Sequence, residues 1–194
     1  MFSEIESIDK QIFLWINQQS SNSFFDALMP FVRNSNNWIP LYALMIILAI
    51  KQEQKKVWIW LVFALLTILI TDQVSSHLIK PLVQRLRPCA DPNFKNEVRL
   101  LLPNCSQGFS FTSSHATNHF GIAIFFMNSL KSTLKNWKFL FLFWAAIIAY
   151  AQVYVGVHYP FDVLSGSVVG ITLGTLTITI YRKIYNKKFA TNNL

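Results

Sequence analysis

Long apolar stretches separated by short polar connections dominate the chain. Five of them can be traced, over roughly Asn36–Ile50, Val57–Ile79, His115–Leu130, Lys138–Val157 and Asp162–Tyr181. A helix needs about 20 residues to cross the hydrocarbon of a bilayer, and several of these stretches are slightly shorter, so tilt or flanking residues must complete the crossing. The pattern predicts an all-α integral membrane bundle of about five transmembrane helices.

A shorter helical pattern precedes these stretches. Ile5, Ile8, Ile12 and Trp15 are three or four residues apart, which places them on one face of a helix with polar residues opposite. We expect this helix, from about residue 5 to residue 19, to lie in the membrane interface. The polar segment over residues 20–35 could contain a short re-entrant piece.

Composition supports a membrane protein, because 53% of the residues are hydrophobic and only 13% are charged. The net charge of +8 would suit nucleic acid, but the cations fall in separate clusters between apolar stretches and form no basic stripe. We therefore expect no nucleic-acid partner. The chain contains no internal repeat, so residues 1–194 are expected to form a single domain.

Two connections and the segment after the last stretch carry clustered cations, which predicts the orientation in the membrane. The clusters contain Lys51, Lys55, Lys56, Lys131, Lys135, Lys138, Arg182, Lys183, Lys187 and Lys188. Positively charged short loops stay in the cytoplasm. The other two connections, Lys80–Ser114 and Gly156–Phe161, then face outward. This predicts a multi-pass protein of the cytoplasmic (inner) membrane whose functional face is directed to the periplasm or exterior.

Both cysteines, Cys89 and Cys105, lie in the long outer connection. Disulfides persist outside the cytoplasm, and closing a loop of this length contributes roughly 3 kcal/mol in the chain-entropy model. We expect a disulfide here, with two free thiols as the alternative.

Two cations mark the start of the same connection. Lys80 and Arg87 are seven residues apart, about two helical turns, although Pro81 disfavours helical geometry at Lys80. Together they suit a phosphate group. Alternatively, both side chains extend toward lipid phosphates as ordinary flanking charges.

Ser113, Ser114 and His115 open the third apolar stretch. Thr112 or Ser113 could cap the helix that starts here, and the same helix N-terminus offers backbone N–H groups to an anion. His115 would then stand beside the bound anion, where it could protonate a leaving oxygen.

His158 and Asp162 are four residues apart around Pro160, just before the last stretch. In a purely structural interpretation, Asp162 is a helix N-terminal charge and His158 an interfacial residue. In a catalytic one, the carboxylate keeps one imidazole nitrogen protonated and leaves the other free to attack phosphorus.

Taken together, these strings resemble the type-2 phosphatidic acid phosphatase family, which shares its core with vanadium haloperoxidases. The strings are Lys80-x6-Arg87-Pro88, Phe109-Ser110-Phe111-Thr112-Ser113-Ser114-His115-Ala116 and Gly156-Val157-His158-Tyr159-Pro160-x-Asp162. The resemblance covers roughly residues 71–170, about half of the chain.

The resemblance implies a role for each matching residue. Lys80, Arg87 and Ser113 would bind phosphate. His115 would be the general acid, and His158 the nucleophile that forms a phosphohistidine, oriented by Asp162. It also implies chemistry without a metal or cofactor on membrane lipid phosphates and pyrophosphates, with phosphate or vanadate as a ligand of the site.

Two departures from the family pattern fall in the phosphate site. Ser114 stands in place of a glycine, and Gln152 in place of an arginine. We assign both to phosphate binding, although a neutral amide brings no charge, and losing one transition-state donor costs about 3 kcal/mol. Arg85 or Arg99, from the same outer connection, could supply the missing charge.

Gly166, Gly170 and Gly174 recur at every fourth position in the last stretch. Such a stripe lets another helix approach closely, and we expect it to pack inside the bundle. A homodimer seam is the alternative.

These observations predict a membrane lipid phosphatase. Undecaprenyl pyrophosphate is the preferred substrate by analogy, with phosphatidylglycerol phosphate, phosphatidic acid and lipid A phosphate as alternatives. Two further alternatives are a lipid phosphotransferase and an inactive scaffold that binds lipid phosphates. No metal site is expected, because no familiar ligand spacing links the histidines.

Overall fold

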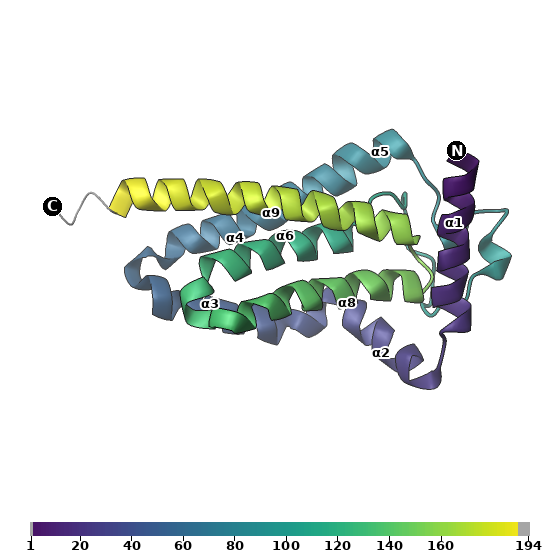
Figure 1. Cartoon of the computed structure of the whole chain (residues 1–194), viewed down its shortest axis with the longest axis horizontal. Helices are drawn as coiled ribbons and strands as arrows, with labels where there is room; N and C mark the ends of the chain where they lie inside the picture. Colours follow the sequence, from purple (N-terminus) through teal and green to yellow (C-terminus); the bar gives the residue numbers. More distant parts are fainter. Residues whose placement is uncertain (1, 190–194) are drawn as a thin grey trace.

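The computed structural model describes residues 2–189, and every regular element within them is a helix. The α-helices are α1 (Phe2–Leu14), α2 (Ser23–Arg33), α3 (Ile39–Glu53), α4 (Val57–Asp72), α5 (Lys80–Val83), α6 (Ser114–Ser129), α7 (Lys131–Leu134), α8 (Leu140–Tyr154) and α9 (Pro160–Phe189). Helices α3, α4, α6, α8 and α9 run along the long axis, and α1 crosses one end of this bundle (Figure 1). The all-α membrane fold predicted from the sequence is confirmed.

Tighter and wider helical turns connect these elements. The 3₁₀ turns are Ser35–Trp38, Gln54–Lys56, Pro88–Ala90, Lys95–Glu97 and Lys135–Phe139, and the π-helical segments are Trp15–Gln19 and Gln73–Ile79.

Within residues 2–189, three helical stretches are long and apolar enough to cross a membrane, namely Ser35–Val83, Lys131–Tyr154 and Pro160–Lys188. The first contains both α3 and α4, between which the chain reverses direction (Figure 1). Helix α6 has only 16 residues. The number of five crossings therefore stays a prediction.

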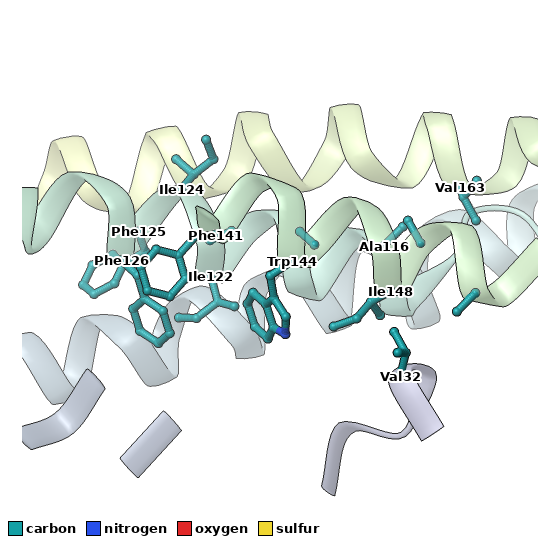
Figure 2. Close-up of a cluster of buried hydrophobic side chains, with 14 of the residues drawn as sticks. Val32, Ala116, Ile122, Ile124, Phe125, Phe126, Phe141, Trp144, Ile148 and Val163 are labelled. Atoms are coloured by element: carbon teal, nitrogen blue, oxygen red, sulfur yellow. The ribbon is translucent and has the colours of Figure 1, made fainter. Parts of the chain in front are cut away.

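Helix α6 is the centre of the bundle and contacts α4, α8 and α9. Its aromatic residues lie at the core, where Phe125 is fully buried and Phe126 stacks on Trp60 with ring centroids 5.6 Å apart. Phe141 and Trp144 of α8 extend the same cluster (Figure 2). Because α6 is covered on several sides, it presents little apolar surface to lipid.

The glycine stripe of α9 packs directly on the backbone of α6. A methyl group on Gly166 would lie 2.7 Å from the carbonyl oxygen of Ser113, and one on Gly174 would lie 2.5 Å from that of Gly121. The expected packing inside the bundle is therefore confirmed. Because α6 covers these glycines, the structure favours this packing over the alternative of a homodimer seam.

Helix α1 turns its apolar stripe outward. Ile8 and Trp15 are 50% and 58% exposed, whereas Asp9 and Asn17 on the opposite face are fully buried. The exposed stripe agrees with a helix lying in the membrane interface. These two polar side chains are not solvated, and Asn17 donates a hydrogen bond to the carbonyl oxygen of Tyr154 at 2.8 Å.

The helix of the second crossing continues past Lys80, contrary to the expectation from Pro81. Lys80 has helical angles, with φ −57° and ψ −46°, and the helix ends at Gln84, which is left-handed. The π-helical segment Gln73–Ile79 widens the turn that the proline ring must enter, which relieves its clash with the preceding carbonyl. Arg87 lies beyond, in extended backbone, so it does not share a helical face with Lys80.

Replacing Gly170 by alanine is expected to destabilise the protein by about 1–3 kcal/mol, because the new methyl group would overlap the carbonyl oxygen of Thr117. The melting temperature in detergent should fall by several degrees. Val168→Leu, which adds a carbon at a 63% exposed position of the same helix, is the control and should not change it. Equal melting temperatures for the two variants would contradict the close packing of α9 on α6.

Candidate active site

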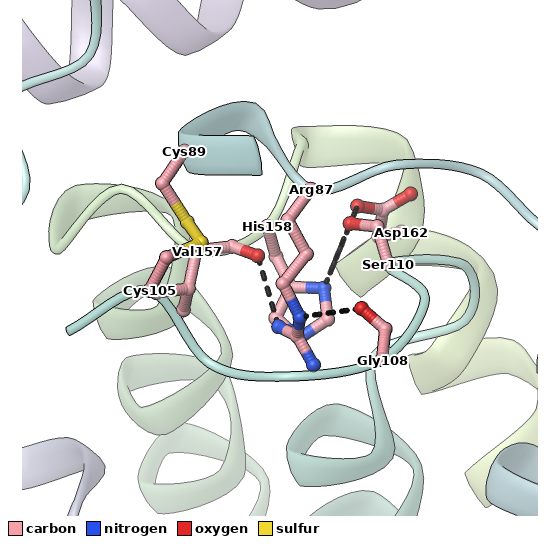
Figure 3. Close-up of a disulfide and its surroundings, with 8 residues drawn as sticks. All are labelled: Arg87, Cys89, Cys105, Gly108, Ser110, Val157, His158 and Asp162. Atoms are coloured by element: carbon pink, nitrogen blue, oxygen red, sulfur yellow. Dashed lines mark hydrogen bonds and ion pairs between the residues drawn. A yellow bond between two sulfur atoms is a disulfide. The ribbon is translucent and has the colours of Figure 1, made fainter. Parts of the chain in front are cut away.

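The three strings singled out in the sequence meet at the end of the bundle that α1 crosses (Figure 1). Arg87 is buried there and uses its guanidinium to join three segments (Figure 3). Its Nε donates to the carbonyl of Gly108 at 3.2 Å, and its Nη1 donates to the carbonyl of Val157 at 3.1 Å. The same Nη1 lies 3.0 Å from Nε2 of His158.

This contact fixes the protonation of His158. Because a guanidinium can only donate, Nε2 must accept, and the single proton of the neutral ring is on Nδ1. Nδ1 lies 3.3 Å from Oγ of Ser110 and 3.5 Å from Oδ2 of Asp162. Burial lowers the pKa of His158 to about 4, although Asp162 acts in the opposite direction. At neutral pH the ring is therefore uncharged, with a lone pair on Nε2.

Asp162, in the first turn of α9, is fully buried but well satisfied. Its Oδ2 accepts a short hydrogen bond from the Ser110 hydroxyl and one of 2.8 Å from the backbone N–H of Tyr159. Its Oδ1 accepts from Nη1 of Arg85 at 2.9 Å. The Ser110 hydroxyl thus bridges His158 and Asp162, a role that sequence reasoning missed although Ser110 is part of the second string.

A second buried carboxylate supports this arrangement from α1. Asp9 forms an ion pair with Nη2 of Arg85 at 2.6 Å and accepts the backbone N–H of Phe161 at 2.9 Å. Burial raises the pKa of Asp9, while both contacts favour its charged form. Asp9 therefore holds the arginine that holds Asp162. Its only sequence signal is an acidic residue that directly follows Ile8 of the apolar stripe.

The N-terminus of α6 brings the second string to the site. Ser113 caps the helix by accepting the N–H of Ala116 at 3.4 Å, as expected, and its own N–H donates to the carbonyl of Asp162 at 3.0 Å. His115 lies in the first turn, with its ring parallel to that of His119 at 6.2 Å. It is within electrostatic range of His158 and Arg87.

Ser114 is accommodated without a positive φ, since the non-glycine residues of that kind in the described part of the chain are Gln54, Gln84 and Lys135. Its hydroxyl lies 3.1 Å from that of Ser75 and 2.8 Å from that of Ser76. The structure therefore uses this hydroxyl in the contact between two helices, and its expected role in phosphate binding stays a prediction.

Lys80 lies at the same end and interacts electrostatically with Arg87 and Asp162. Among residues 2–189, no hydrogen bond or ion pair holds its ammonium group.

The expected disulfide between Cys89 and Cys105 is present, with Cα atoms 5.8 Å apart. It ties the segment that follows Arg87 to the segment that leads to Gly108 (Figure 3).

The surroundings of Gln152 differ from expectation. Arg85 is engaged by Asp9 and Asp162, and Arg99 forms an ion pair of 2.8 Å with Asp26, so neither supplies a charge near Gln152. Instead, the buried amide of Gln152 accepts a hydrogen bond from Nε of Arg33 at 3.3 Å. Sequence reasoning missed Arg33 because it treated residues 20–35 as a connection.

A cavity of about 280 Å³ lies beside His115. It is lined by Ser35, Tyr42, Ile68, Asp72, Ser114, His115, Asn118, His119 and Ile122. Ile68, Asp72 and Asn118 also line an apolar groove of about 550 Å³, together with Val62, Leu65, Leu66 and Leu69. A cavity that contains several polar side chains and adjoins an apolar groove suits a lipid with a phosphorylated head group.

The chain is similar to several lipid phosphatases. It is 34% identical to the lipid A 4'-phosphatase of Bacteroides thetaiotaomicron over 95% of this chain and 81% of that protein. The lipid A 4'-phosphatase of Porphyromonas gingivalis is 26% identical over 91% and 74% of the two chains. The undecaprenyl-diphosphatase of Sulfolobus acidocaldarius is 31% identical over 74% of this chain and 63% of that protein.

Solved structures share the fold. The PAP2-type phosphatidylglycerolphosphate phosphatase of Bacillus subtilis superposes with a TM-score of 0.74 at 22% identity, over 93% of this chain and 88% of that one. Aquifex aeolicus LpxE superposes with a TM-score of 0.65 at 24% identity, over 87% and 93%. The family model described as the PAP2 superfamily matches residues 60–186. The chain therefore belongs to the PAP2 superfamily, whose relatives named above are phosphatases of lipid phosphates.

Proposed function

We propose that this protein removes a phosphate ester from a lipid A-like glycolipid through a phosphohistidine formed on His158. The main support for this proposal is the chain of hydrogen bonds that runs from Arg87 through His158 to Ser110 and Asp162. It leaves an uncharged imidazole whose Nε2 lone pair accepts a hydrogen bond from the guanidinium of Arg87, and a phosphate that engages this guanidinium would free the lone pair for attack. A nucleophile beside the cation that binds its target is the arrangement that phosphoryl transfer requires.

In the first step, Nε2 of His158 attacks phosphorus and the bond between phosphorus and the lipid oxygen breaks. Lys80, Arg87 and the backbone N–H groups at the start of α6 stabilise the charge that develops on the equatorial oxygens. His115 gives its proton to the departing lipid oxygen. The Nδ1–H of His158 stays hydrogen-bonded to Ser110 and Asp162, which stabilise the positive ring.

In the second step, His115 is unprotonated and takes a proton from water. The water oxygen attacks phosphorus, the bond between phosphorus and Nε2 breaks, and inorganic phosphate leaves. Both histidines return to their starting states, with His115 again protonated. No other proton donor is needed, because the proton lost by His115 in the first step is recovered in the second.

The head-group cavity supports a glycolipid substrate. Beside His115 it presents the hydroxyl of Tyr42, the carboxylate of Asp72 and the amide of Asn118. The Asn118 Oδ1 is buried without a hydrogen-bond partner within residues 2–189. Such groups bind sugar hydroxyls, and the adjoining apolar groove would hold acyl chains in contact with the membrane.

The two lipid A 4'-phosphatases cover more of this chain than the undecaprenyl-diphosphatase, which further supports the assignment. Undecaprenyl pyrophosphate, the substrate preferred from the sequence, becomes the second candidate. It is supported by the 31% identity to the undecaprenyl-diphosphatase.

The distribution of charge supports a site on the outer side of the cytoplasmic membrane. The lysine-rich connection between α3 and α4 and the basic end of α9 lie at the end of the bundle opposite α1 and the site (Figure 1). Clustered cations mark the cytoplasmic side. The disulfide near the site also favours a compartment outside the cytoplasm.

Phosphate release from detergent-solubilised lipids tests the proposal. We expect fastest release from lipid A, and slower release from undecaprenyl diphosphate and phosphatidylglycerol phosphate. His158→Ala should lower the rate on the order of 10³-fold or more because it removes the nucleophile. His77→Ala, at an exposed histidine, should retain activity. An unchanged rate in folded His158→Ala would exclude the mechanism, and faster release from undecaprenyl diphosphate would exclude the substrate assignment.

The protonation of His158 can be measured by NMR on protein with isotopically labelled histidine, using His158→Ala to assign the signal. The ring should be neutral with its proton on Nδ1 at pH 7, and should become an imidazolium only as the pH falls through about 4. Below that pH the lone pair on Nε2 is lost and attack on phosphorus stops. A charged ring at pH 6, or a proton on Nε2 at pH 7, would contradict the proposed role.

A further inference from the structure

Arg33 is a cation at the site end of the bundle that has no carboxylate partner. It is the last residue of α2, and within residues 2–189 no ion pair joins it to an acidic side chain. Arg85 and Arg99, by contrast, are both paired with carboxylates. A guanidinium has five N–H donors, and within residues 2–189 the hydrogen bond from Arg33 to Gln152 uses a single one of them. The others are available to an anion.

The position of this guanidinium is set by Gln152 in α8, which is fully buried. The Gln152 Nε2 donates to the carbonyl of Ile148 at 3.5 Å, which directs its Oε1 to Arg33. Val32, next to Arg33, lies beside Ile148 in the core and anchors the end of α2 (Figure 2). The backbone carbonyl of Gln152 also accepts the N–H of His158 at 3.3 Å. One buried residue thus connects Arg33 to the loop that carries the imidazole.

The charges around Arg33 favour a bound anion. It lies within electrostatic range of Arg87 and His115, and Arg87 is in turn within range of Lys80. Burial lowers the pKa of Arg33, but a guanidinium stays charged at neutral pH. The nearby carboxylate, Asp162, is already neutralised by Arg85. Cations gathered in a partly buried site repel one another, and a multiply charged anion relieves that repulsion.

We propose that Arg33 binds a nonbridging oxygen of the phosphoryl group as it passes from the lipid to His158, and that Gln152 is the residue that positions it. This inference rests on the function proposed above. Negative charge in phosphoryl transfer spreads over the three equatorial oxygens, and a guanidinium fork matches two of them better than an ammonium does. Helix α2 thereby supplies the charge that position 152 lacks relative to the family pattern.

The test compares Arg33→Gln, Arg33→Lys and wild type for kcat, KM and the affinity of orthovanadate, which mimics the phosphoryl group in transit. Arg33→Gln is expected to lower kcat/KM about 10²–10³-fold, mainly through kcat, and to weaken vanadate binding in parallel. Arg33→Lys keeps the positive charge but lacks the forked geometry of a guanidinium. Its kcat/KM and vanadate affinity should therefore fall between those of wild type and of Arg33→Gln. Lys95→Gln, which removes an exposed charge, is the matched control and should match wild type.

Arg33→Gln with kcat/KM and vanadate affinity within about twofold of wild type would overturn the inference. If this variant does not fold, Arg33→Lys decides, and a rate equal to that of wild type would overturn it as well. If Arg33 variants behave like wild type while His158→Ala is inactive, the inference about Arg33 is wrong but the proposed function is still supported. Wild-type protein that hydrolyses no lipid phosphate overturns the proposed function, and vanadate affinity then still decides whether Arg33 binds a phosphate-like anion.

A double variant that moves the guanidinium from residue 33 to residue 152 distinguishes a role of Arg33 in binding phosphate from a role in packing. In Arg33→Gln with Gln152→Arg, the guanidinium and the amide exchange helices across the same hydrogen bond. We expect this double variant to recover at least about tenfold in kcat/KM over Arg33→Gln, because the charge again faces the phosphate. A folded double variant no more active than Arg33→Gln would show that packing at residue 33, and not its charge, is what matters.

Discussion

The burial of one carboxylate, that of Asp162, is the constraint on which the rest of the site depends. Removing an ionised group from water costs several kcal/mol unless charges and hydrogen bonds replace the water. Asp162 receives an arginine, a hydroxyl and a backbone N–H, from the outer connection and from the loop before α9. Each of these groups must be in place at once, so satisfying this carboxylate draws separate loops together around His158.

Close approach of α6 and α9 makes that convergence possible. The glycines of α9 let its backbone lie against α6, and at the site end the N–H of Ser113 meets the carbonyl of Asp162. The N-terminus of α6 is thereby fixed to the first turn of α9, which carries Asp162. In a membrane, where apolar surfaces gain little by contacting each other, such backbone contacts and internal hydrogen bonds supply much of the specificity of packing.

The site end combines neutralised and unneutralised charges. Arg85 and Arg99 are paired with carboxylates and serve the structure, whereas Lys80, Arg87 and Arg33 are not paired with one in the described part of the chain. Some basic residues therefore neutralise carboxylates and others have no acidic partner among the described residues, a difference that composition alone cannot show. Cations without counter-charges are the groups that our proposal assigns to the phosphate, and the apolar groove lined by Ile68, Asp72 and Asn118 is the one that it assigns to the lipid chains.

The sequence by itself determined the all-helical membrane class, the family and the residues of its three strings, because apolar periodicity and catalytic motifs are local patterns. It also indicated the disulfide and the inward packing of the glycine stripe. Only the tertiary structure decided how Asp9, Ser110 and Arg33 are used. The hydrogen bond from Arg33 to Gln152 spans 119 residues, and that from Phe161 to Asp9 spans 152. No local pattern records such contacts, since they arise when distant helix ends are brought together by packing.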